Sequence, residues 1–224
     1  MYDVVFNSGL IGLLIWILLF ATSTAAAALI IRCAWILRRK RFGSAAVLEQ
    51  LMALLKVGNW DGAYAYFQVN PSVTTRIAGA VLRVAHVKNK AERQEIAVAA
   101  LDKEVRAVLR QINTLSLCGN IAPMLGLLGT VTGMVDAFMG LGTAMGPEKA
   151  SILAISISQA LYTTAAGLLI AVPAITFATI FRNLLEKRTE DVSEAVEQIL
   201  EAIPEPEAPR PGYLRTDTVK ILPE

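Results

Sequence analysis

The sequence predicts an all-α integral membrane protein with three transmembrane helices and long cytoplasmic helical extensions. The chain has 224 residues, of which only 18% are charged, and a mean hydropathy of +0.51, which argues against an ordinary soluble globular protein. Uncharged or nearly uncharged runs cover about residues 8–31, 112–143 and 151–181, each long enough to cross a bilayer as a helix. Basic residues gather on one side of these runs and set their orientation.

These observations divide the chain into consecutive segments. They are an N-terminal segment with transmembrane helix 1 (1–37), a cytoplasmic helical domain (38–110), transmembrane helix 2 (111–143), a short periplasmic loop (144–150), transmembrane helix 3 (151–181), a cytoplasmic helical extension (182–203) and a disordered proline-rich tail (204–224). The basic flanks place the N-terminus in the periplasm and the C-terminus in the cytoplasm.

The first span is rich in Leu and Ile, and we interpret it as a lipid-facing anchor with one close-packing patch at Ala25–Ala28. Thr24–Ala27 resembles a signal-peptide cleavage site, but the stretch before the span carries Asp3 and no basic residue, so we expect no cleavage. The cluster Arg38–Arg41 follows the span and is interpreted as a topology anchor and anionic-lipid contact, not as a nucleic-acid surface.

Hydrophobic periodicity predicts a helical cytoplasmic segment. The expected helices cover Ala45–Lys56, Trp60–Phe67, Ser72–Val87 and a stretch from about Ala91. Because nothing stops the last one before span two, we expect a single helix of roughly 75 Å that continues through the membrane.

Span two carries a stripe of glycines. Gly119, Gly126, Gly133 and Gly140 recur every seven residues, and Gly129 lies four residues before Gly133. Such a stripe lets another helix backbone approach closely. A phosphate-binding role is excluded because no strand–turn–helix context accompanies these glycines. Pro123 is expected to kink the helix.

Span three has a seam of small residues. Ala160, Thr164, Gly167, Ala171, Ala174 and Ala178 alternate in steps of four and three residues, which is an interhelical packing pattern. Pro173 is the expected kink of this helix, which we predict to continue as an amphipathic extension over Asn183–Ala202 until Pro204 ends it.

Polar residues of the two spans fall at matching depths. If the connecting hairpin is centred between residues 147 and 148, Asp136 matches Gln159 and Thr130 matches Thr164, while Thr163 lies on the side of Gln159. These groups either hydrogen-bond between helices or line an ion pathway. The first alternative suits Ser and Thr but not Asp136, because an unpaired carboxylate at membrane depth costs about 2.5 kcal/mol or more.

Two stretches resemble a known family. Residues 121–131 (IAPMLGLLGTV), together with residues 159–168 (QALYTTAAGL) and the following 171–174 (AVPA), resemble the ExbB/TolQ/MotA proton-channel family, specifically its three-span ExbB/TolQ branch. The overall layout agrees over roughly residues 5–202.

The resemblance implies a pentameric ring in the bacterial inner membrane. The ring would enclose the membrane helices of a single-span ExbD/TolR-like partner, whose aspartate carries protons and whose cycle acts on a TonB- or TolA-like protein. Protons, or sodium, would be the coupling ion, with no metal or other cofactor. Thr130 and Thr164 match the pore-lining threonines of the family.

One position departs from the family pattern. Many members have a glutamate where this chain has Gln159, and glutamine cannot exchange a proton. We therefore expect Asp136 to supply the missing carboxylate, or the partner's carboxylate to suffice. The departure also keeps open a non-conducting membrane scaffold that assembles partner subunits. An enzyme is not supported, because the sequence shows no nucleophile–base set, metal-ligand cluster or nucleotide loop.

Overall fold

A computed structural model shows an all-helical chain in which three helices are long and apolar enough to cross a membrane. The structure describes residues 9–38, 42–43, 45–85, 88–143 and 148–204. Its helices are α2 (Gly9–Ile36), α4 (Ala45–Lys56), α5 (Trp60–Val69), α6 (Val73–Leu82), α7 (Lys90–Thr143) and α8 (Glu148–Ala202). The predicted fold class is therefore confirmed at the level of all-helical structure with three candidate spans.

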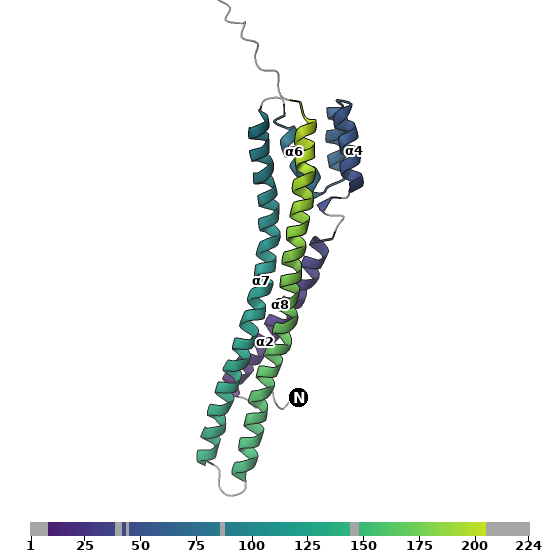
Figure 1. Cartoon of the computed structure of the whole chain (residues 1–224). Helices are drawn as coiled ribbons and strands as arrows, with labels where there is room; N and C mark the ends of the chain where they lie inside the picture. Colours follow the sequence, from purple (N-terminus) through teal and green to yellow (C-terminus); the bar gives the residue numbers. More distant parts are fainter. Residues whose placement is uncertain (1–8, 39–41, 44, 86–87, 144–147, 205–224) are drawn as a thin grey trace, which may run out of the picture.

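The two longest helices, α7 and α8, form an antiparallel pair along the whole molecule (Figure 1). They contain 54 and 55 residues, so each is about 80 Å long at a rise of about 1.5 Å per residue. The single helix expected from about residue 91 through span two is present as α7. Both helices continue through their internal prolines, Pro123 and Pro173.

The shorter helices α4, α5 and α6 lie beside one end of this pair (Figure 1). The helix predicted over residues 45–56 is α4, and α5 runs slightly past the predicted end. The prediction for Ser72–Val87 was too long, since residues 83–85 form turns, and its last two residues lie outside the described part of the chain. Ser72 is the N-cap of α6, and its side chain accepts a hydrogen bond from the Thr75 amide. At the other end, the amides of Val84 and Ala85 donate to carbonyls three residues back, which tightens the chain into turns.

The buried core lies mainly in the half of the molecule that contains α6. Ile77 and Val81 of α6, Ile112 of α7 and Ile199 of α8 are each at most 1% exposed. Arg93, near the start of α7, is also fully buried, and its Nη1 donates a 3.2 Å hydrogen bond to the Pro204 carbonyl. This contact joins the start of α7 to the end of α8.

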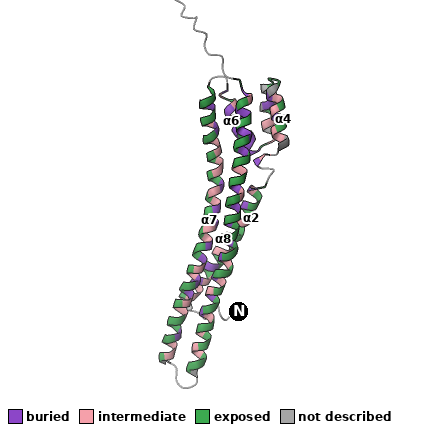
Figure 2. Ribbon diagram, in the orientation of Figure 1, coloured by how far each residue is buried: buried purple, intermediate pink, exposed green. Residues whose placement is uncertain are grey.

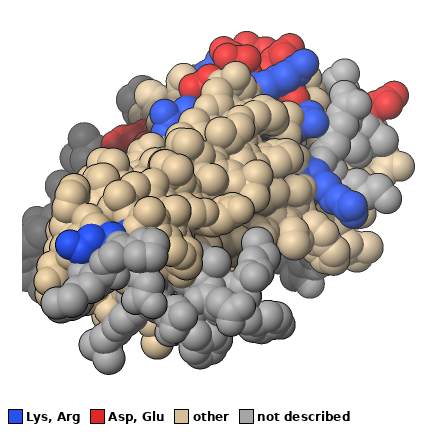
Figure 3. Space-filling model, turned by 90° about the horizontal axis from the view of Figure 1, so that it is seen from below, with Lys and Arg blue, Asp and Glu red and all other residues tan. Residues whose placement is uncertain are grey.

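The other half of α7 and α8 exposes large apolar side chains, and exposed residues follow both helices along their length (Figure 2). Viewed from below, most of the surface is formed by residues without charge (Figure 3). The expected loop over 144–150 falls partly outside the described residues, while residues 148–150 belong to α8. The predicted disordered tail lies almost entirely outside them.

Candidate functional site

The glycines of α7 lie where the backbone of α8 comes closest. A Cβ added at Gly126 would lie 2.9 Å from the Thr163 carbonyl oxygen, and one at Gly133 would lie 2.9 Å from the Ala160 Cβ. From the opposite side, a Cβ at Gly167 would lie 2.5 Å from the Ala122 carbonyl oxygen. The same holds along the rest of the stripe: Gly119 meets Ile175, Gly129 meets the Thr163 side chain and Gly140 meets Ile152. Small residues thus hold the two backbones in close contact.

The threonines of α8 bond to α7 through one carbonyl. The hydroxyls of Thr163 and Thr164 lie 3.2 Å and 3.0 Å from the Gly126 carbonyl oxygen, to which they donate. Thr163, at 7% exposure, belongs to the buried stripe of α8 that also contains Ala160, Gly167 and Ala171. The small-residue pattern in the sequence predicts Thr164, instead of Thr163, in this seam. The hydroxyl of Thr130 donates instead to Leu127 within α7, at 2.7 Å.

Asp136 and Gln159 line a common cavity of about 80 Å³ between the three spanning helices. At about 30 Å³ per molecule, this space holds two or three waters. From α7 it is lined by Gly129, Thr132, Gly133 and Asp136, from α8 by Ser156, Gln159, Ala160 and Thr163, and from α2 by Gly12, Ile15 and Trp16. The matched depth derived from the hairpin is consistent with this shared cavity, whereas Thr130 and Thr164 are not among its lining residues.

The cavity is lined by polar groups that can hold water and by one carboxylate. The hydroxyl protons of Thr132 and Thr163 are already donated to carbonyls of α7 and α8, so these oxygens offer lone pairs to the cavity. Gln159 adds an amide with an acceptor oxygen and donor N–H groups, Ser156 and Trp16 add further donors, and Asp136 adds a carboxylate. Within the described residues, Asp136 takes part in no ion pair, and no group of His, Cys, Asp and Glu could hold a metal ion.

Sequence reasoning missed the contribution of α2. We expected a lipid-facing anchor with one packing patch, but buried residues follow one face of the helix for most of its length: Ile15, Leu19, Ala26 and Cys33, each at most 4% exposed. This face packs on α7 and α8. The sequence did contain a pattern that could have identified Thr132 and Ser156 as cavity-lining residues. The lining residues of α7 and those of α8 each follow the i, i+3, i+4, i+7 spacing of one helix face.

Comparison with known proteins identifies the family. Residues 70–194, more than half of the chain, match the MotA/TolQ/ExbB proton channel family. The chain belongs to this family. Membership places it among proton-channel proteins and not among enzymes, as the sequence predicted.

Individual relatives of this MotA/TolQ/ExbB chain include biopolymer transport proteins. It is 41% identical over 96 residues to Biopolymer transport protein exbB1 of Vibrio cholerae, covering 43% of this chain and 42% of that protein. It is 28% identical over 170 residues to Biopolymer transport protein ExbB of Pseudomonas putida, covering 73% and 50%. The chain spans about half the length of the curated relatives it matches.

Proposed function

We propose that this chain is the ExbB/TolQ-like subunit of an ion-driven inner-membrane motor. It harvests the proton motive force together with a single-span ExbD/TolR-like partner and energises transport or envelope processes at the outer membrane, through a TonB- or TolA-like protein. The observation that carries the proposal is the polar cavity shared by Asp136 and Gln159 between three candidate spans of a proton-channel family member.

In this proposal Asp136 is the protein's own proton-exchanging group. Gln159 replaces the glutamate of many relatives and serves as its hydrogen-bonding neighbour. A carboxylate at membrane depth is costly unless it meets water, a partner or a proton, and the cavity supplies room for water beside it. Thr130 and Thr164 are assigned to the pathway by their match to the family's pore-lining threonines.

Assembly as a homopentamer is proposed from the family resemblance, and the single chain leaves open an apolar surface that lipid or other subunits can cover. Leu127, Val131 and Phe138 of α7 and Leu161 and Leu169 of α8 are each at least 49% exposed. Such a surface requires cover by lipid or by other helices. The proposed orientation is supported by basic residues beside the spans: Arg106 and Arg110 precede span two, and Arg182 follows span three. The positive-inside rule favours a cytoplasmic side for these flanks, and hence a periplasmic N-terminus and a cytoplasmic C-terminus.

The decisive experiment measures proton flux in proteoliposomes that contain the full chain and its single-span partner, with a pH-sensitive dye inside. We expect Asp136→Asn to reduce flux at least tenfold, because an amide cannot exchange the proton. Asp102→Asn, which removes an exposed carboxylate from the same helix, is the matched control and should conduct normally. Adding Gln159→Glu to Asp136→Asn should restore flux by returning a carboxylate to the cavity.

The second candidate is a non-conducting scaffold, which Gln159 itself favours because it lacks the exchangeable proton of the family's glutamate. A scaffold would conduct nothing with wild-type sequence, and the Asp136→Asn variant would assemble partners as well as wild type does. Flux that is present but unchanged by Asp136→Asn would instead assign the whole relay to the partner. Replacing the proton gradient by a sodium gradient in the same vesicles identifies the coupling ion.

A further inference from the structure

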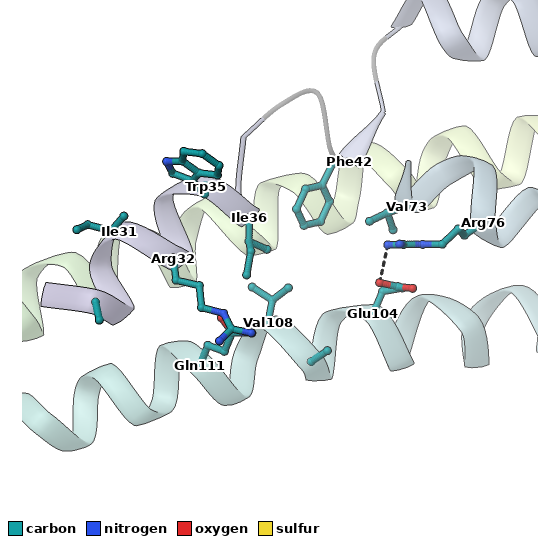
Figure 4. A pocket seen from close by; sticks show the side chains of 12 residues that line it. Ile31, Arg32, Trp35, Ile36, Phe42, Val73, Arg76, Glu104, Val108 and Gln111 are labelled. Carbon is teal, nitrogen blue, oxygen red and sulfur yellow. Dashed lines mark hydrogen bonds and ion pairs between the residues drawn. The ribbon is translucent and has the colours of Figure 1, made fainter. Parts of the chain in front are cut away.

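A second cavity, of about 600 Å³, opens between the end of α2, α6 and the part of α7 that precedes its spanning segment. Its inner wall is apolar: Ile36 of α2 and Phe42 and Val73 point toward Val108 of α7 (Figure 4). It is separate from the Asp136 cavity and shares no lining residue with it.

The level of this cavity in the membrane follows from its position on α2. Residues 28–36, its last turns, supply much of the lining and form the end of a candidate span that covers Ile11–Ile36. Trp35 lies at this level and is 67% exposed, with the Arg38 guanidinium 5.7 Å from its ring centre. Trp residues favour the boundary between hydrocarbon and headgroups, so the cavity lies at the headgroup level.

The cavity carries an uncompensated positive charge. Arg76 pairs with Glu104 at 2.8 Å across one end, so these two charges cancel. Arg32 has no ion-pair partner among the described residues and extends from α2 toward Gln111 of α7 (Figure 4). The Oε1 atom of Gln111 is buried and accepts no hydrogen bond there. The site thus presents a cation that has no ion-pair partner among the described residues, next to an apolar wall.

We propose that this cavity binds the headgroup of an anionic phospholipid, for which phosphatidylglycerol is the probe. The phosphate pairs with Arg32, since guanidinium–phosphate contacts are charge-assisted and bidentate. The part of the acyl chains nearest the headgroup lies against the apolar wall. A soluble phosphate would meet the same cation but would leave the apolar wall uncovered.

The test uses the full-length chain in nanodiscs and native mass spectrometry to count retained lipids. Phosphatidylglycerol, phosphatidylethanolamine and phosphatidylcholine of identical acyl chains are offered in competition. We expect phosphatidylglycerol to be retained about tenfold more tightly than phosphatidylcholine, the size of one charge-assisted contact. Arg32→Gln should abolish this preference, whereas Arg106→Gln, which removes an exposed cation from α7 outside the cavity, should keep it.

Gln111→Glu tests the site with Arg32 in place, because the new carboxylate competes with the phosphate for the guanidinium. It should lower phosphatidylglycerol retention as strongly as Arg32→Gln. Equal retention in Arg32→Gln and Arg106→Gln, or equal retention of all three lipids by wild type, would overturn the proposal. Displacement of the lipid by millimolar inorganic phosphate would also overturn it, because the ligand would then be a soluble anion. Loss of the oligomer in the Arg32→Gln variant would overturn it too, because Arg32 would then be a subunit contact.

Discussion

Replacing Gly126 by alanine tests whether the contact between α7 and α8 depends on glycine. The new Cβ would lie 2.9 Å from both the Thr163 carbonyl oxygen and the Thr164 Cα. Both are backbone atoms of α8 and cannot rotate away as a flexible side chain would. The two helices must therefore separate locally if the methyl group is to fit.

The expected magnitude is a balance of opposing terms. Alanine favours a helix over glycine by about 0.8–1 kcal/mol, which would stabilise α7. Overpacking costs about 1–3 kcal/mol. Separation also lengthens the bonds from the hydroxyls of Thr163 and Thr164 to the Gly126 carbonyl, each contributing about 0.6 kcal/mol in a membrane. Together these terms predict a net destabilisation of about 1–3 kcal/mol.

The assay is reversible unfolding in mixed micelles, followed by far-ultraviolet circular dichroism as the fraction of denaturing detergent rises. The matched control is Gly142→Ala in the same helix, where an added Cβ would meet no atom within 4 Å. The control should be neutral or slightly stabilising. If Gly126→Ala unfolds at the same detergent fraction as Gly142→Ala, or later, the close approach of the two backbones does not limit stability and the reasoning is refuted.

Other contacts give sharp expectations. Arg93→Ala removes the donor to the Pro204 carbonyl and should cost about 2 kcal/mol or more, visible as faster amide exchange over residues 199–203. Gly58→Ala, at φ +74° with open space around it, should cost about 1–2 kcal/mol. Gly43→Ala, at φ +118° and with its Cβ 2.6 Å from Thr74 Oγ1, should cost more, and both variants are compared in the detergent unfolding assay used for Gly126→Ala. A double-mutant cycle of Arg76→Gln and Glu104→Gln should give less than about 1 kcal/mol and decrease with salt, since both side chains are partly exposed.

Local patterns were sufficient to predict the helices. The period of apolar residues identified α4 with its observed bounds, and the absence of any stop signal identified α7 as one helix across two environments. The end of α6 was not predictable in this way. Val84 and Ala85 continue the apolar pattern, but their amides bond three residues back instead of four. Nothing in the residue types at these two positions signals the change.

The rotation of α8 about its axis was also beyond the sequence pattern. Steps of four and three through Ala160 and Gly167 pass near both Thr163 and Thr164, and small-residue spacing alone cannot separate them. The contact with α7 determines which threonine is buried. Gly129 leaves room for the Thr163 side chain, and Thr163 is therefore the buried one. The role of α2 was hidden for a similar reason. Its face toward α7 and α8 is as apolar as its face toward lipid, so hydropathy carries no directional signal.

The polar cavity itself follows from the same small residues that pack the helices. Gly133 and Ala160 meet face to face, and neither has a side chain long enough to fill the space beside the contact. Asp136 and Gln159 follow in the adjacent positions of that face, too polar to enter an apolar contact unhydrated. A gap therefore remains beside the close contact of Gly133 and Ala160. Ile15 and Trp16 of α2 cover this gap. A carboxylate at position 136 therefore lies in the same gap as a side chain at position 159, and this shared location underlies the proposal that Asp136 is the proton-exchanging group.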